Sequence, residues 1–535
     1  MSPDRIKVGL LIDGFFVPAW IHETIKRIRE SDCAMISLVV KKQMELPVKR
    51  QQKKPGDNFN FLAYNLYRKL ENKYVKLNPN AFSQKNISDL IINVPVLNIQ
   101  PVEEGNFDRI QENDLHLIDA YQLDVCIKFG FQNLKGYILT MPKFGVWEFE
   151  ENLINHKVSL AGVREVMQGY CETAVSLRLL SEKCEEGYIL YESFSSTNTL
   201  INKNQNTACW KAVSFIPRKL KELYETKGDC FFEKVKEKQS LVSENKHTSY
   251  APNNSRFISY LINRYFKWGK KKAGNLFNTD QWILLYFNKK DGLPLSIANY
   301  NELIPSKDKF WADPCVFSFN EKHFIFFEEY LFKKKKAHIS VAELDETGRL
   351  SNLQIVLDKP YHLSYPFVFN EGTDIFMIPE TSANKTIEIY KCVSFPYKWE
   401  FQMYLMENLH AVDATIHYHE NKFWLFVNIK ENKGASAWDE LFLFYSNELL
   451  TTKWEPHSKN PVISDVRQAR PAGRIFMHNE KFYRPSQDCS CTYGYATNIN
   501  EIITLNETEY EERKITTLFP EWNKKITAVH TYSHT

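Results

Sequence analysis

Hydrophobic residues follow two different patterns in the two halves of the chain. The first half opens with an unbroken apolar run at residues 6–12, IKVGLLI, and a second run, AMISLVV, lies at 34–40. Between them, Trp20, Ile21 and Ile25 recur at helical spacing after Pro18. Fully apolar strands that alternate with amphipathic helices are typical of an open, mainly parallel sheet with helices on its faces. We therefore predict an α/β domain with a βαβ opening.

The alternation of strands and helices continues along this half. We predict helices at 59–76, 113–121 and 163–168, and one long helical segment at 206–236. The expected strands lie at 89–92, 125–129, 145–149, 174–180 and 188–194.

The second half repeats one strand pair four times, at intervals of roughly 50 residues. Each unit has an apolar strand, a turn rich in Asn, Gly or Glu, and a second strand, and the units lie at 310–330, 362–382, 410–430 and 468–488. Such a period is typical of propeller blades. Because a circular sheet must hide its end strands, we expect a fifth blade in which a strand at 525–535 joins the strand at 282–287. The sequence thus predicts an all-β five-bladed propeller.

These patterns divide the chain into three parts. We assign 1–236 to the α/β domain, 237–280 to a linker with a short connecting helix, and 281–535 to the propeller. The linker is predicted from the polar, unpatterned segment at 239–255, and the helix from the apolar spacing at 257–268. A chain of 535 residues is too long for one hydrophobic core, which agrees with this division.

Composition narrows the classes of partner. The net charge is only +3, and the single dense lysine run, Lys333 to Lys336, fits a solvated hairpin tip, so nucleic acid is not expected. No segment reaches 18 uninterrupted apolar residues, and the first residues lack a signal-peptide pattern. Ten cysteines are dispersed without paired CxxC spacing. We therefore expect a cytoplasmic protein with free thiols, no membrane span and no zinc site.

Polar residues at the strand ends of the repeats predict a site. The second strand of each hairpin runs back along the first, so its end lies at the rim where the first strand begins. Carboxylates and amides suit sugar hydroxyls, and the nearby aromatic residues Trp311, Tyr365 and Tyr493 suit sugar rings. Alternatively, such residues simply cap turns and accept backbone N–H bonds. The strand starts contribute Asp313, Tyr365, Asp413 and Arg470, and the strand ends contribute Glu328, Glu380, Asn428 and Gln487.

The α/β domain resembles the Rossmann-like fold of methionyl-tRNA and sugar-nucleotide formyltransferases. The resemblance is carried by IKVGLLIDG, LDVCIKFGFQNLKGYIL, FGVWEFEE and the stretch from VSLAGVREV to GYILYES. It implies a site for 10-formyltetrahydrofolate with an Asn, a His and an Asp. The matching positions here are Glu148, Glu150 and Glu185 (or Glu186), which cannot reproduce an Asn donor and a His acid–base group. His156 in the following loop is an alternative imidazole. The resemblance thus favours a domain that kept the fold and lost formyl transfer.

The propeller resembles the N-terminal domain of plant glucosamine inositolphosphorylceramide transferases and, more distantly, the invertase and arabinanase/xylosidase glycosidases. The pattern runs WADP…FFEEY…YHLSYPFVF…MIPETSANKTIEIY…VDATIH. The glycosidase resemblance implies that Asp313 acts as base or nucleophile and that Asp413 positions it. The glycosidases carry their general acid, a Glu, on blade four, and this residue is missing here. Glu380 or Glu328 would therefore have to supply the proton to the leaving group.

Two further expectations concern charged ligands. Arg467 and Arg470 stand where the glycosidases carry their acid, and guanidinium groups there would recognise a phosphate or a carboxylate. The resemblance also implies that His530 near the chain end can help to hold a divalent cation in the central channel.

Together these features predict a carbohydrate-active protein that binds a sugar, polysaccharide or sugar nucleotide at the propeller mouth and cleaves or transfers it. Two alternatives stay open. One is an active sugar N-formyltransferase whose propeller binds the acceptor, and the other is a non-catalytic glycan-binding protein.

Overall fold

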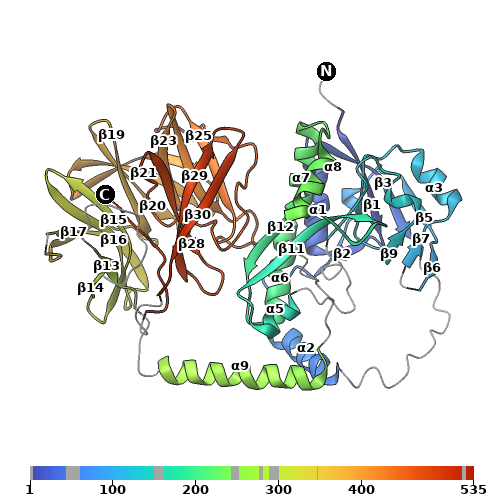
Figure 1. The fold of residues 1–535 in the computed structure, drawn as a ribbon, viewed down its shortest axis with the longest axis horizontal. Helices are drawn as coiled ribbons and strands as arrows, with labels where there is room; N and C mark the ends of the chain where they lie inside the picture. Colours follow the sequence, from blue (N-terminus) through green and yellow to red (C-terminus); the bar gives the residue numbers. More distant parts are fainter. Residues whose placement is uncertain are drawn as a thin grey trace. The chain divides into compact units, whose positions relative to one another are not determined.

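Two compact units make up the protein, as seen in a computed structural model (Figure 1). One unit comprises Met1–Ser193 and Thr197–Tyr265, and the other comprises Phe194–Ser196 and Phe266–Thr535. The structure describes residues 4–43, 61–105, 107–149, 162–241, 252–275, 281–287, 300–345, 347–520 and 526–534.

A seven-stranded sheet with the order β12-β11-β10-β8-β1-β3-β5 forms the first unit. Neighbouring strands from β10 to β5 pair in parallel, and β11 runs antiparallel to β10. The predicted mainly parallel sheet is therefore confirmed, whereas its assignment to the formyltransferase fold stays a prediction. The strands are β1 (Ile6–Ile12), β3 (Ala34–Lys42), β5 (Val96–Ile99), β8 (Val125–Lys128), β10 (Val146–Phe149), β11 (Glu172–Ser181) and β12 (Cys184–Ser196).

Helices cover both faces of this sheet, because side chains along β1 alternate between two apolar clusters. Leu10 packs in the cluster that holds Ile25 of α1 and Ile216 of α7, and Leu11 packs in the cluster that holds Ile118 of α3. The helices of the unit are α1 (Ala19–Glu30), α2 (Leu62–Tyr74), α3 (Glu112–Asp119), α5 (Val163–Gln168), α6 (Ile201–Ala212), α7 (Phe215–Glu225) and α8 (Phe231–Leu241). Two small sheets are formed by β2 (Phe16–Pro18) with β4 (Gln84–Asn86), and by β6 (Val102–Glu104), β7 (Phe107–Arg109) and β9 (Asn133–Lys135).

Two sequence-based predictions in this unit are wrong. The strand expected at 89–92 is a short 3-10 helix (Ser88–Leu90), and the edge strand is instead β5. Both segments are apolar, and only the parallel ladder with β3 selects the second one. The long helix expected at 206–236 is instead three helices, α6 to α8. Between α7 and α8 the backbone turns into the left-handed region at Lys227, Gly228 and Cys230, which ends α7.

The predicted connecting helix is confirmed and is longer than expected, since α9 spans Asn254–Asn275. Residues 242–251 of the predicted linker lie outside the described residues. Within the described part of the chain, no helix combines the length and the apolar character needed to cross a membrane.

Four antiparallel four-stranded sheets, called blades here, dominate the second unit (Figure 1). Consecutive blades pack face to face, and one apolar cluster lies between each successive pair. Blade one is β15 (Lys309–Phe319), β16 (Lys322–Leu331), β17 (Lys336–Leu344) and β18 (Leu350–Leu357); blade two is β19 (Ser364–Glu371), β20 (Asp374–Thr381), β21 (Thr386–Ser394) and β22 (Lys398–Glu407). Blade three is β23 (Ala411–His419), β24 (Lys422–Ile429), β25 (Leu441–Ser446) and β26 (Glu455–Pro456); blade four is β27 (Phe476–His478), β28 (Lys481–Asp488), β29 (Ala496–Leu505) and β30 (Tyr510–Leu518).

The prediction for the fifth blade is wrong in its strand pairing. β13 (Leu284–Tyr286) pairs with β14 (Asn301–Leu303) in a two-stranded sheet whose apolar side packs on blade one. Residues 526–534 form no strand and run as a tail between blades four and one. The Tyr532 N–H donates to the Ala472 carbonyl, and the Val316 N–H donates to Ser533 Oγ. The tail composition resembles a strand, but its backbone groups bind loops rather than a sheet edge.

Candidate functional site

The first strands of blades one to three share one irregularity at the centre of the propeller. Their pairing register shifts between Ala312 and Cys315, between Ser364 and Phe367, and between Val412 and Thr415. The residue inside each bulge has a positive φ, namely 51° at Asp313, 44° at Tyr365 and 54° at Asp413. Side chains rarely adopt this conformation, and bulges of this kind redirect a side chain.

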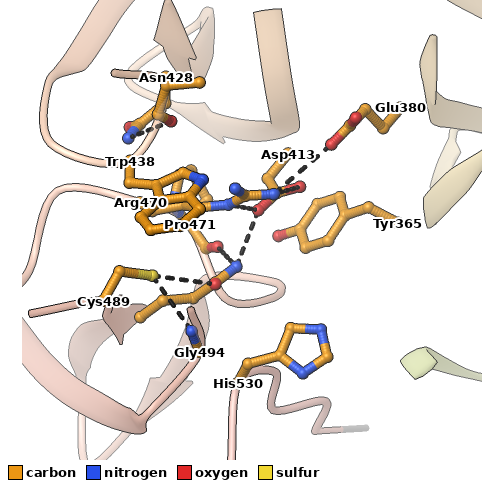
Figure 2. A network of polar contacts seen from close by, with 12 residues as sticks. Tyr365, Glu380, Asp413, Asn428, Trp438, Arg470, Pro471, Cys489, Gly494 and His530 are labelled. Atoms are coloured by element: carbon orange, nitrogen blue, oxygen red, sulfur yellow. Dashed lines mark hydrogen bonds and ion pairs between the residues drawn. The ribbon is translucent and has the colours of Figure 1, made fainter. Parts of the chain in front are cut away.

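The redirected side chains meet around one axis. We call Asp313, Glu328, Glu380, Asp413, Arg470, Gln487 and His530 the axial cluster, and Figure 2 shows most of its members with their partners. The strand pairings place Glu328 opposite Ala312, Glu380 opposite Ser364 and Asn428 opposite Val412. The predicted convergence of strand starts and strand ends at one rim is therefore observed.

Asp413 is held by two side chains from blade four. Arg470 donates through Nε to Oδ2 at 2.5 Å and through Nη2 to Oδ1 at 3.2 Å, and Gln487 Nε2 donates to Oδ2 at 2.8 Å (Figure 2). All three residues are buried. The Arg470 guanidinium also lies 3.6 Å from Glu380 Oε2 and 4.9 Å from the centre of the Tyr493 ring. A bidentate buried pair of this kind fixes the orientation of the carboxylate.

Asp313 is held from the other side of the axis. His530 Nε2 lies 2.7 Å from Asp313 Oδ1, and the Tyr365 N–H donates to Oδ2 at 3.2 Å. Burial by itself would raise the pKa of Asp313, but His530 and Arg470 outweigh it and hold the pKa below its usual value. The His530 ring packs 4.3 Å from Trp282 and 5.5 Å from Tyr493. Asp313 is therefore an ionised carboxylate in a buried place.

Glu328 and Glu380 have the opposite electrostatic state. Burial, followed by the negative charge of Asp313, raises the pKa of Glu328 well above its usual value. Burial and then Asp413 raise the pKa of Glu380 in the same way, although Arg470 opposes the shift. The Glu380 side chain is 15% exposed and that of Glu328 is 8% exposed. The cluster thus joins ionised aspartate to protonated glutamate, which is the arrangement that separates a base from an acid.

Two other predicted residues line the same centre. The Tyr365 hydroxyl lies 2.9 Å from Thr415 Oγ1, and burial raises the pKa of this phenol. Asn428 is buried and donates through Nδ2 to the Ala437 carbonyl at 3.2 Å, while its Oδ1 has no hydrogen-bond partner in the described structure. Figure 2 shows Asn428 beside Trp438, on the Asp413 side of the cluster.

Trp311 and Arg467 are not brought into the cluster. Trp311 pairs with Glu329 across the hairpin and therefore faces away from Glu328; its ring packs 5.1 Å from Phe327 and its Nε1 donates to Glu329 Oε1 at 3.3 Å. Arg467 binds Asp465, with Nε 2.9 Å from Oδ1 and Nη2 2.7 Å from Oδ2. The predicted sugar-stacking and anion-binding roles of these two side chains have no support in the geometry.

The sequence reasoning missed His362, which lies at the mouth. Its Nε2 is 3.4 Å from Glu328 Oε1, its side chain is 39% exposed, and burial lowers its pKa although Asp313 opposes this. A signal existed in the repeats, because His362 stands three residues before Tyr365 as His410 stands three residues before Asp413. His362 and Glu380 are the members of the site nearest to solvent.

The residues at the centre do not fit the divalent cation expected at His530. Its Nε2 is used by Asp313, and the described residues include no group of three or more His, Cys, Asp or Glu side chains arranged to share a metal ion. A cation needs several such ligands.

Of the three formyltransferase-like positions in the α/β unit, the structure describes the side chain of Glu148. Glu148 on β10 forms a buried ion pair with Lys128, its neighbour on β8. Glu150 and His156 lie outside the described residues, as does the side chain of Glu185. The pair with Lys128 gives Glu148 a structural partner.

Comparison with known proteins finds a family similarity in the second unit. Residues 296–534 match the family model described as "Glucosamine inositolphosphorylceramide transferase 1, N-terminal". The resemblance predicted from the propeller motifs is thereby confirmed. Glucosamine inositolphosphorylceramide transferase 1 of Arabidopsis thaliana is 34% identical over 218 residues, which are 40% of this chain and 28% of that protein. The protein of the same name from Oryza sativa subsp. japonica is 34% identical over 206 residues, 38% of this chain and 27% of its own length. This chain therefore spans little more than a quarter of these relatives.

Solved structures give weaker similarities. A thermostable family-43 glycoside hydrolase has a TM-score of 0.31 at 11% identity and covers 38% of this chain and 75% of its own. The family 117 glycoside hydrolase Zg3597 of Zobellia galactanivorans has a TM-score of 0.32 at 10% identity and covers 45% and 77%. The description of the propeller therefore rests on its own sheet topology. All members of the axial cluster lie inside the range matched by the transferase family model.

Proposed function

We propose that the propeller is a carbohydrate-active site, in which a glycan or the sugar of a sugar nucleotide enters at His362 and Glu380 and reaches the axial cluster. Relatives of the matched range are named glucosamine inositolphosphorylceramide transferase 1, which supports a reaction at a sugar. The observation that carries the proposal is the convergence of Asp313, Asp413 and Glu380 in one buried cluster, where the pKa of Asp313 is lowered and that of Glu380 is raised. Such a pair is what glycosidic bond cleavage or transfer requires.

Each cluster residue then has a role. Glu380 is the proton donor to the leaving oxygen, since it is more exposed than Glu328. Asp313 is the base or nucleophile. Asp413 orients the substrate, and Arg470 and Gln487 hold the Asp413 carboxylate in place. Glu328 adds a second protonated carboxyl that can donate to a sugar hydroxyl.

The test begins with a glycan array probed with the whole chain, followed by turnover assays on the glycans that bind. Glu380→Gln and Asp313→Asn should each lower turnover about a hundredfold or more, because each removes one half of the acid–base pair. Glu388→Gln is the matched control, since Glu388 is a buried carboxylate in blade two that binds Tyr361 and Tyr390 instead of the cluster. Turnover that survives both cluster substitutions would remove the proposal.

The second candidate is a non-catalytic glycan-binding protein. It is favoured by the partners of the two aspartates, since Asp413 is held by Arg470 and Gln487 and Asp313 by His530 and the Tyr365 amide. Glycan binding without turnover in the parent protein would select this candidate.

For the α/β unit we infer a formyltransferase-like scaffold that has lost formyl transfer. Glu148 is engaged by Lys128 and offers no amide donor to a tetrahedral intermediate. Titration calorimetry of the whole chain with 10-formyltetrahydrofolate, with and without an amino-sugar nucleotide, should show no heat of folate binding. Folate binding together with formyl transfer would establish the N-formyltransferase alternative instead.

A further inference from the structure

In the α/β unit, α2 and the part of α9 up to Tyr265 expose apolar side chains. On α2 these residues recur every four positions, and on α9 every three or four positions, so each set lies along one side of its helix. Their exposed fractions range from 47% to 71%. We call the set the apolar face, and it comprises Leu62, Leu66, Leu70, Tyr74, Ile258, Ile262 and Tyr265. Contiguous exposed apolar surface of this kind marks an interaction site.

The two helices are neighbours and run in the same general direction. The Ala63 N–H donates to Asn254 Oδ1 at 2.9 Å, so the two N-terminal ends lie together. The Tyr67 ring packs 5.3 Å from Phe257, and Arg264 Nη1 donates to the Tyr67 hydroxyl at 2.8 Å further along. These contacts make a buried seam between α2 and the first turns of α9.

Both halves of the apolar face flank this seam on the same side. Viewed from the N-termini, Leu66 and Leu70 lie about a quarter turn from the buried side of α2 in one sense. Ile258 and Ile262 lie about a third of a turn from the buried side of α9 in the opposite sense. Because the buried sides face each other and the helices run the same way, opposite senses of rotation bring both sets to one surface. The helix pair therefore presents one continuous apolar face.

The charge on these helices is strongly positive. α9 contains six cationic residues and no acidic residue, and four of its lysines follow the apolar face within residues 267–272. α2 adds Arg68, Lys69 and Lys73 against the single acid Glu71. The chain as a whole carries a net charge of only +3, so the excess is concentrated here.

We propose that this surface binds an anionic lipid bilayer, with the apolar face at the boundary of headgroups and acyl chains and with the net positive charge of the two helices attracting the anionic headgroups. The occupant is chosen by complementarity, because a bilayer surface offers apolar depth and negative charge together. Tyr74 and Tyr265 have the amphipathic rings that suit this boundary. A nucleic acid would use the cations and leave the aliphatic side chains in water. The site is separate from the axial cluster and independent of the proposed glycan activity.

The first experiment uses the unaltered full chain and sedimentation with vesicles. Vesicles of phosphatidylcholine with about 30% phosphatidylserine should bind the protein at low salt. Pure phosphatidylcholine vesicles, or about 0.5 M salt, should reduce partitioning at least about tenfold. The first removes the negative lipid charge, and the second screens its attraction to the basic residues. No binding to the anionic vesicles, or equal binding to both compositions, would overturn the proposal.

The second experiment locates the surface. The double variant Leu66→Glu, Ile262→Glu places charge in the middle of the face and should lower partitioning into anionic vesicles at least about tenfold. The matched control is Ile355→Glu, an equally exposed residue on β18 of the propeller, which should bind as the parent does. Circular dichroism melting of each variant confirms folding.

Two further outcomes would overturn the proposal, one by assigning the face to a second copy of the chain and one by placing vesicle binding elsewhere. The first is concentration-dependent self-association, measured by light scattering, that Leu66→Glu abolishes while vesicle binding is absent. The second is vesicle binding that is unchanged in the double variant.

Discussion

At the scale of single residues, the axial cluster depends on giving each buried carboxyl group a different partner. Asp413 has the Arg470 guanidinium, Asp313 has His530 and a backbone amide, and the pKa of Glu380 is raised by burial and then by the nearby Asp413. Four like carboxylates would repel one another in so small a buried space. The repulsion is relieved by the Arg470 guanidinium, by the contact of His530 with Asp313 and by the raised pKa values of Glu328 and Glu380.

The Asp413–Arg470 pair gives the first prediction. Asp413→Asn leaves Arg470 buried without its strongest partner and should lower the free energy of unfolding by about 3–5 kcal/mol. Glu343→Gln, which removes the charge that pairs with the exposed Lys322 and keeps an acceptor for Asn352, should cost less than about 1 kcal/mol. Urea unfolding of the two variants measures both values, and similar losses would show that the buried pair is not special.

The Lys128–Glu148 pair of the α/β unit gives the second prediction. Lys128→Met removes the cationic partner that Glu148 has on β8 and should destabilise this unit by about 1–3 kcal/mol. Adding Glu148→Leu should recover part of that loss, since the carboxylate that lost this partner is then absent. If the double variant is as unstable as the single one, Glu148 depends on other partners more than on Lys128.

At the scale of elements, three bulges and one glycine determine which side chains reach the propeller centre. The three bulges turn Asp313, Tyr365 and Asp413 inward from strands whose regular alternation would not do so. On blade four, Gly494 leaves room for the C-terminal tail, because a Cβ at that position would overlap the Cβ of His530. The tail then brings His530 to Asp313.

Gly494→Ala is therefore the third prediction. The substitution should detach the tail and expose the amides of residues 526–534 to faster hydrogen exchange, measured by mass spectrometry. Gly372→Ala is the control, since Gly372 has a similar positive φ of 57° and open space around it. Both variants should lose about 1–2 kcal/mol to backbone strain, and only Gly494→Ala should change exchange in the tail. Equal exchange in the two variants would contradict the role of the glycine.

At the scale of the whole molecule, the shifted carboxyl groups make propeller stability depend on pH in both directions. Glu328 and Glu380 have raised pKa values, so above pH of about 4.5 the folded protein keeps protons that the unfolded chain releases. Stability then falls as pH rises, until the raised pKa values are passed. Glu329 behaves oppositely, because its bonds from His338 and Lys309 outweigh burial and lower its pKa. Its contribution is lost as pH falls below about 4.5.

The fourth prediction follows from this balance. Between pH 5 and 8 the propeller should lose about 1.4 kcal/mol per pH unit for each raised glutamate that is still protonated. The double variant Glu328→Gln, Glu380→Gln should show a flatter profile, because glutamine does not titrate. Urea titrations across this range, followed by hydrogen exchange of propeller peptides, give the slopes. An unchanged slope in the variant would show that other groups carry the pH dependence.

The tertiary structure also shows which features of the propeller could be predicted from the sequence and which could not. The strand pairs and their turns were predictable because the repeat period, the alternation of apolar and polar residues and the turn residues can be read from short stretches of sequence. The position of Trp311 was not, since one step of strand register turns it to the opposite face from Glu328. His362 was missed because it lies before a strand, and only the packing of blade two on blade one brings it to Glu328.

The sequence by itself determined the two architectures, the four hairpins and the convergence of their polar ends, because these follow from periodicity and from the antiparallel geometry of each hairpin. The tertiary structure alone decided which residues become partners across blades: Asp413 with Arg470, Asp313 with His530, and the tail with blades four and one. The protonation states follow from those contacts, since burial and the nearest charge set a pKa and both depend on segments far apart in the chain. It also decided that α2 and α9 lie side by side and share one apolar face, which neither helix pattern shows alone.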